Sequence, residues 1–286
     1  VGRAEVVAAA LASAATIDAM AQEGTDATEA NPDAKHPVEP DIAADIPPVY
    51  QEHSLNPLGA QALILSLLLA EEEDVRQEQL ALVDQAQTQG LTELVVTLAP
   101  GVQALGAPRR LPLVEMCLPA LKAMSPGQYR RFKQLLMRLI QADRRTELYE
   151  WCLFQLVRHY LDPEFLQVKP SRARIRRLSS VHRQLSAVLS ILVYARDDDH
   201  ERRFQEAAAQ LEVSKAALLP REQVSVADFS RAVHALADCY PLLKPRILKA
   251  MVLAASDNDS LNATEREIIC SIAAVMDCPI PTLPGM

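Results

Sequence analysis

The chain has 286 residues, of which 49% are hydrophobic and only 4% aromatic, and its formal net charge is −8. This length allows two domains of ordinary size, each with its own core. The acidic balance argues against a general nucleic-acid-binding protein, because such proteins neutralise phosphates with a basic surface. Ala, Leu, Gln, Glu and Arg dominate, and few segments alternate as strands do, so the composition predicts an all-α fold.

The amino-terminal part differs in composition from the rest of the chain. Residues 1 to 21 are Ala-rich, and we predict an N-terminal helix outside the main body. The sequence opens with Val-Gly-Arg rather than Met, so we expect this chain to be part of a longer protein. Residues 22 to 48 are rich in acids and prolines, and they bury too little apolar surface to offset their ordering entropy. We therefore predict that residues 22 to 48 form a flexible acidic Pro-rich linker.

Helical periodicity is nearly continuous from Pro57 onward. We assign residues 49 to 168 to a first helical module and residues 169 to 286 to a second. Three segments share the order of an apolar helix, a short acidic turn and a second helix, and they span residues 62 to 83, 130 to 157 and 245 to 273. The sequence therefore predicts a bundle of about ten helices, built from repeated helix–acidic turn–helix hairpins.

Local signals predict several helix boundaries. Ser125 is an N-cap candidate, and Gln128 three residues later completes a capping box. Ser225, with Asp228 three residues on, predicts another helix start. A long helix is predicted to end at the Asp162-Pro163 pair, because proline disfavours helical backbone at the residue before it.

The acidic turn of the last hairpin has two interpretations. Asp257 and Asp259 occupy the first and third positions of a calcium loop. The sixth position is Asn262 rather than glycine, and the twelfth is Ile268 rather than glutamate. Asn262 is instead a good N-cap, and Glu265 three residues later can bond back to its amide. We favour the helix cap, and a divalent-cation site of Asp257, Asp259 and Glu265 is the alternative.

Catalytic motifs are not evident in the sequence. The five cysteines lie in apolar context without a C-x-x-C pair, which predicts buried free thiols in a reducing compartment. The string from His200 to Phe204 matches a zinc-protease helix only in part, because Phe204 replaces the second histidine. We therefore assign no catalytic or cofactor-binding residue to this chain, and a small-molecule enzyme with an unrecognised site is an alternative function.

A basic run occupies residues 169 to 183. Its members are Lys169, Arg172, Arg174, Arg176, Arg177 and Arg183. One interpretation is a solvated connector that enters a helix. The other is attraction to an anionic membrane leaflet, worth about 1 kcal/mol per basic side chain. RNA binding is disfavoured because no stacking aromatic residues are interleaved. No run of 18 apolar residues occurs, so we predict no segment that spans a bilayer.

Several sequence segments, taken in their order along the chain, resemble a known protein family. These are LPLVEMCLPALKAMSPGQYRRFKQLLMRLIQAD (111–143), LYEWCLFQLVRHYLDPEF (148–165) and LKAMVLAASDNDSLNATEREIICSIAAVMDCPIPTL (248–283), preceded by NPLGAQALILSLLLAEEEDVRQEQLALV (56–83). Together they resemble the helical carboxy-terminal extension of bacterial membrane-bound zinc metalloproteases of the HtpX and CAAX-prenyl-protease type. The paired helix–acidic turn–helix units are also similar to the TerB-like tellurite-resistance fold.

The resemblance implies a parent protein with a membrane anchor and a zinc ion on a His-Glu-x-x-His helix, which acts as an endopeptidase in membrane-protein quality control. No position of this chain matches that motif, so zinc is expected in the parent only. The chain itself is then expected to be a non-catalytic module on the cytoplasmic side, tethered to the inner membrane through its parent. Its expected partners are the parent protease domain, substrates, other copies and an anionic membrane surface, without nucleic acid. The TerB-like similarity implies the alternative of a free-standing cation-sensing module.

Overall fold

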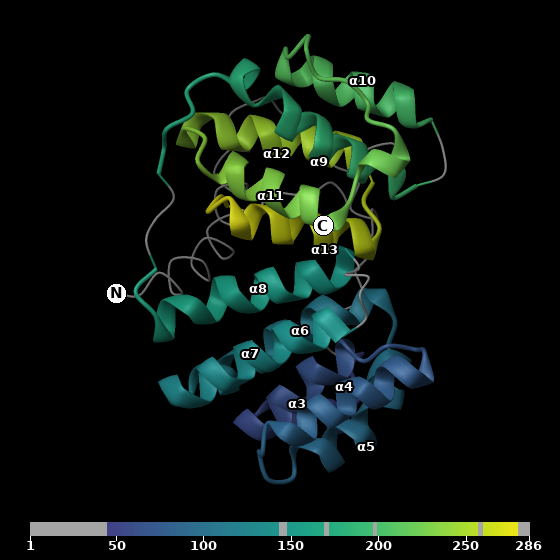
Figure 1. Ribbon diagram of the computed structural model, residues 1–286, viewed down its shortest axis with the longest axis vertical. Coiled ribbons are helices and arrows are strands. Elements are labelled where there is room, and N and C mark those ends of the chain that lie inside the picture. The colour runs from purple at the N-terminus through teal and green to yellow at the C-terminus, as the bar shows by residue number, and fades with distance from the viewer. Residues whose placement is uncertain (1–44, 143–147, 169–171, 197–198, 257–259, 280–286) are drawn as a thin grey trace, which may run out of the picture.

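The computed structural model describes residues 45–142, 148–168, 172–196, 199–256 and 260–279. Within these ranges the chain is all-helical and has no named strand, which confirms the predicted all-α multi-helix class (Figure 1). Twelve α-helices are present there, against about ten expected. They are α2 (Pro48–Ser54), α3 (Pro57–Leu67), α4 (Glu73–Gln85), α5 (Leu91–Gln103), α6 (Ala107–Lys122), α7 (Pro126–Ala142), α8 (Leu148–Phe165), α9 (His182–Tyr194), α10 (His200–Leu211), α11 (Val226–Ala237), α12 (Lys244–Ala255) and α13 (Ala263–Val275).

The first hydrophobic core is built around α3. Leu63, Ile64 and Leu65 of this helix are all fully buried, as expected for a helix that is apolar on every side. Helices α5 and α6 pack directly against α3. Ile46 is also buried in this core, so the last few residues of the predicted linker pack on the bundle instead of extending from it. Residues 22 to 44 lie outside the described ranges.

Helix α2 was not predicted from the sequence. Pro47 and Pro48 favoured a linker, whereas in the structure Pro47 is the N-cap and Pro48 begins the helix. Proline suits this position, because the first turn of a helix has no internal partner for its N–H group. The prolines therefore start a helix here.

The second hydrophobic core is built around α9. Leu185, Leu189 and Leu192 of this helix are fully buried. Phe204 of α10 and Phe229 of α11 fill the space beside them. Helix α12 packs against both α9 and α10.

Helix α8 contributes to both cores and lies between them in Figure 1. Leu153 and Val157 belong to the first core, whereas Trp151 and Cys152 belong to the second. Helix α13 runs beside α8, and the Ser271 hydroxyl of α13 donates a hydrogen bond to the Cys152 carbonyl at 3.3 Å. The division into modules 49 to 168 and 169 to 286 stays a prediction.

A buried ion pair also crosses between the two halves. The Nη2 atom of Arg110 on α6 lies 3.2 Å from Oε2 of Glu267 on α13, although the geometry is not that of a hydrogen bond. The guanidinium of Arg110 also lies 4.6 Å from the ring centre of Tyr149 on α8. Burial raises the pKa of Glu267, and the charge of Arg110 opposes this shift.

The predicted start signals agree with the structure, and one predicted stop does not. Gln128 Oε1 accepts from the Ser125 amide at 2.8 Å, and the Ser225 side chain accepts from the amide three residues on. Helix α8, however, continues through Pro163 to Phe165. The Phe165 ring stacks on Tyr129 of α7 at 4.5 Å, so tertiary packing holds the last turn beyond the proline.

Each predicted hairpin coincides with two consecutive helices. The three pairs are α3 with α4, α7 with α8, and α12 with α13. The turn between α7 and α8 contains residues 143 to 147, and the turn between α12 and α13 contains residues 257 to 259. Both segments lie outside the described ranges. A common hairpin geometry for the three units therefore stays a prediction.

Because α8 belongs to both cores, we expect the two halves to unfold together. Leu63→Ala opens a cavity in the first core and should cost roughly 2–5 kcal/mol. The single tryptophan, Trp151, lies in the second core. Its fluorescence should therefore report the lower midpoint of this variant in denaturant, together with circular dichroism. Leu55→Ala, at a position 80% exposed, is the control that should change neither signal. A Trp151 transition unchanged by Leu63→Ala would contradict the coupling.

Candidate functional site

The basic run is held against the turn that precedes α12. Ile175 forms a parallel bridge with Cys239. The amides of Arg174 and Ile175 both donate to the Asp238 carbonyl, at 2.9 and 3.1 Å, and the Tyr240 amide donates to the Ile175 carbonyl at 2.8 Å. Because backbone atoms make these bonds, the segment keeps an extended form while its side chains remain available.

The side chains of this segment alternate, as they do in a strand. Ile175 is partly buried and packs against the second core. Arg174 and Arg176, its neighbours in sequence, are exposed, and so is Arg172. Successive side chains of extended backbone point to opposite sides. One inward isoleucine therefore orients a row of three arginines toward solvent.

The positive charge of this row is largely uncompensated. Arg174 Nε lies 3.9 Å from Asp238 Oδ2, a long ion pair between side chains that are 62% and 36% exposed. Within the described ranges, Arg172, Arg176 and Arg177 form no ion pair, although the Arg172 amide bonds to Asp238. Arg183 is also exposed, at the start of α9, and Lys169 lies outside the described ranges.

Tyr240 and Leu242, which were not predicted as site residues, lie beside Arg176. Arg176 places its guanidinium carbon 5.2 Å from the ring centre of Tyr240, which is within cation–π range. Arg176, Tyr240, Leu242 and Leu243 line a hollow of about 250 Å³. Leu242 is 84% exposed. In the sequence, Tyr-Pro-Leu-Leu looks like core, so no local signal revealed that Leu242 would face solvent.

The acidic turn forms the predicted helix cap. Asn262 Oδ1 accepts from the Glu265 amide at 2.9 Å, and the Asn262 amide donates to Glu265 Oε2 at 2.8 Å. The other carboxylate oxygen of Glu265 accepts from Arg196 Nη1 at 2.9 Å. Both oxygens of this proposed metal ligand are therefore engaged by protein groups. Asp257 and Asp259 lie outside the described ranges, and the cation site stays a hypothesis.

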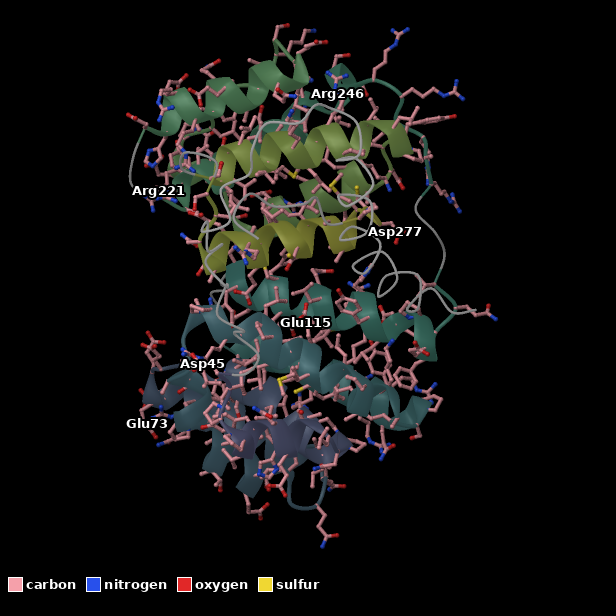
Figure 2. All side chains as sticks on the ribbon, turned by 180° about the vertical axis from the view of Figure 1, so that it is seen from behind. Asp45, Glu73, Glu115, Arg221, Arg246 and Asp277 are labelled. Carbon is pink, nitrogen blue, oxygen red and sulfur yellow. The ribbon has the colours of Figure 1, made fainter. Side chains whose placement is uncertain are left out.

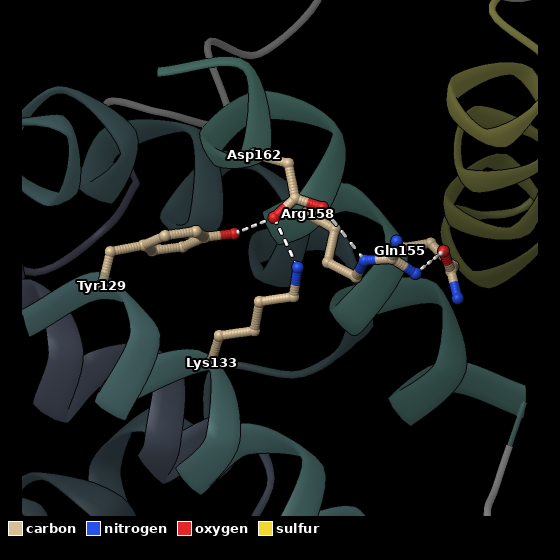
Figure 3. Close-up of polar contacts among 5 residues, drawn as sticks. All are labelled: Tyr129, Lys133, Gln155, Arg158 and Asp162. Atoms are coloured by element: carbon tan, nitrogen blue, oxygen red, sulfur yellow. Dashed lines mark hydrogen bonds and ion pairs between the residues drawn. The ribbon is translucent and has the colours of Figure 1, made fainter. Parts of the chain in front are cut away.

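The densest polar cluster of the first core centres on Asp162 (Figure 3). Its Oδ1 atom accepts from the Tyr129 hydroxyl and from Lys133 Nζ, each at 2.6 Å. Its Oδ2 atom accepts from Arg158 Nε at 3.2 Å. Burial tends to raise the pKa of Asp162. The hydrogen bonds from Lys133 and Tyr129, with the charges of Lys133 and Arg158, nevertheless hold this pKa below its ordinary value. The carboxylate thus stays charged, and the cluster ties α7 to α8.

The cysteines are free thiols, and four of the five are buried. Burial raises the pKa of Cys117 and of Cys270 to about 12, and that of Cys239 to about 11. These thiols are therefore protonated at neutral pH and are poor nucleophiles. Phe204, which replaces a ligand in the partial zinc motif, is fully buried in the second core. Within the described ranges, no group of three or more His, Cys, Asp or Glu is placed to hold a metal ion.

A second hollow of about 410 Å³ lies where α3, α7 and the segment between α4 and α5 meet. Its floor is apolar and includes the buried side chains of Leu91, Phe132 and Leu135. Its polar lining residues are Gln61, which is buried, and Gln87, Thr88, Gln128 and Arg131.

Comparison with known proteins gave no match: no family model, no curated protein and no solved structure is similar to the chain. None of the helices in the described ranges is both long and apolar enough to cross a bilayer.

The cap and the cation hypothesis make different predictions for Asn262→Ala. If Asn262 serves as a cap, this change should lower the free energy of unfolding by about 1 kcal/mol. The loss should be the same with and without calcium, magnesium or zinc. Asn56→Ala is a matched control, because Asn56 Oδ1 caps α3 through the Gly59 amide at 2.7 Å. Saturable calorimetric binding of one of these ions, abolished by Asp257→Ala, would instead favour the cation site.

Proposed function

We propose that this chain is the non-catalytic helical module of a bacterial membrane-bound zinc metalloendopeptidase that acts in protein quality control. The module docks substrates, partner proteins or further copies of itself against the parent protease domain, on the cytoplasmic side of the inner membrane. The sequence segments that resemble the metalloprotease extension support this parentage, and so does the similarity of the predicted hairpins to the TerB-like fold. The zinc ion and its ligands belong to the parent, so no step of catalysis is assigned to this chain.

The exposed arginine row is the observation that carries the proposal. The chain has a net charge of −8, yet Arg172, Arg174 and Arg176 project from one side of a single extended segment. Such a concentrated charge is attracted to an anionic leaflet even when the whole protein is acidic. The row thus orients the module against a membrane, with the other faces left for protein partners.

The groove between α3 and α7 supports the docking role. It lies in the first core, whereas the arginine row lies against the second. Its exposed rim residues, Gln87, Gln128 and Arg131, offer hydrogen-bond donors to the backbone of an extended or unfolded segment. A module of this kind binds the membrane with one half and a protein segment with the other.

The membrane contact is tested by cosedimentation with vesicles that contain phosphatidylserine. Arg172→Gln with Arg176→Gln removes two exposed charges of the arginine row and should weaken binding roughly 30-fold, at about 1 kcal/mol per arginine. The matched control is Arg130→Gln with Arg131→Gln, which removes two consecutive exposed arginines from α7. Equal weakening by both pairs, or vesicle binding unchanged by the first, would contradict the orientation.

The parentage has a separate test in the genomic reading frame upstream of Val1. We expect it to encode a His-Glu-x-x-His helix and at least two apolar spans, because the parent needs a zinc site and an anchor. An upstream sequence that lacks both would overturn the metalloprotease proposal. The charge of the arginine row would remain as a separate observation.

A further inference from the structure

We propose that Tyr240 and Leu242 form the apolar tip of a lipid-binding surface, in which Leu242 enters an anionic bilayer while the arginine row binds the headgroup phosphates. This inference deepens the proposed function and rests on its membrane contact. It assigns a role to two residues that the basic run does not contain, and it fixes which end of the second core faces the lipid.

The backbone holds Leu242 outward. The residue lies in the short 3₁₀ turn Pro241–Leu243 that leads into α12. Leu243 packs against the second core, and Lys244 is buried and donates to the Met276 carbonyl at 2.5 Å. Since both following residues are anchored inward, the turn cannot fold Leu242 back without losing these contacts. An 84% exposed leucine is thus a built feature of this turn.

The surroundings of the tip are cationic and interfacial. Tyr240 is 37% exposed and lies under the Arg176 guanidinium, so a ring with a polar hydroxyl lines the same hollow as Leu242 and Arg176. Tyrosine favours the headgroup level of a bilayer, and arginine pairs well with phosphate. Arg246, labelled in Figure 2 near the start of α12, adds a partly compensated charge, since Glu212 lies 3.7 Å from it.

Lipid is favoured over other partners by the shape and chemistry of this surface. Four residues line the hollow beside Leu242, whereas a stable protein interface involves roughly 20–30 residues on each partner. Nucleic acid is disfavoured because Tyr240 is the one aromatic side chain that contacts the arginine row within the described ranges. A protruding apolar side chain among cations needs only a soft apolar layer beneath phosphates, which a bilayer provides.

The test places a fluorescent side chain at the tip. Leu242→Trp should show a blue shift on binding phosphatidylserine vesicles and strong quenching when the acyl chains are brominated. Trp151 is buried, and the unmodified protein gives its background signal. Leu55→Trp is the matched control, because Leu55 is 80% exposed and lies two residues before α3, a helix at the opposite end of the molecule from α12 (Figure 1). It should show neither the shift nor the quenching.

A further variant and the possible outcomes of both tests separate this inference from the proposed function. Leu242→Ser, which is expected to fold because the site is exposed, should weaken vesicle binding roughly tenfold and make the remaining binding more sensitive to salt. Vesicle binding that is lost in the Arg172, Arg176 double variant, without quenching at residue 242, would overturn the inserted tip alone. No vesicle binding by the unmodified chain would overturn both. A dimer that Leu242→Ser dissociates would assign the tip to self-association instead and overturn the lipid inference.

Discussion

Helix α8 must bury apolar side chains on two sides, and this requirement links the two cores. Leu153 and Val157 are taken up by the first core and Trp151 by the second, so neither half is complete without this helix. The Asp162 cluster reinforces the link on one side, because Tyr129 and Lys133 of α7 both donate to the charged Asp162 carboxylate of α8. On the other side, α13 covers α8 and brings Glu267 to Arg110.

The same packing logic produces the exposed surface. In the second core, inward anchors alternate with outward side chains at two places that are far apart in sequence. Ile175 is anchored and Arg174 and Arg176 face solvent, while Leu243 is anchored and Leu242 faces solvent. The bridge between Ile175 and Cys239 brings the two places together. A core contact on each segment thus creates a combined basic and apolar surface.

The acidic turn shows how a carboxylate acquires a structural role. Glu265 is buried, and a buried charge is stable only when it is paired and hydrogen-bonded. Asn262 and Arg196 meet both needs, and the positive end of α13 adds to them. The cap and the Arg196 ion pair therefore give Asn262 and Glu265 a structural role, whereas the cation site with Asp257 and Asp259 stays a hypothesis.

Features that depend on neighbours within about one helical turn could be predicted from the amino-acid sequence. The all-α class, the caps at Ser125 and Asn262 and the position of the basic run all follow from such local chemistry. Tertiary structure alone decided that α8 passes Pro163, that Ile175 meets Cys239 and that Leu242 is exposed. The reason is physical: these outcomes depend on which distant side chains fill a core, and an apolar residue looks the same in sequence whether it anchors the core or projects from it.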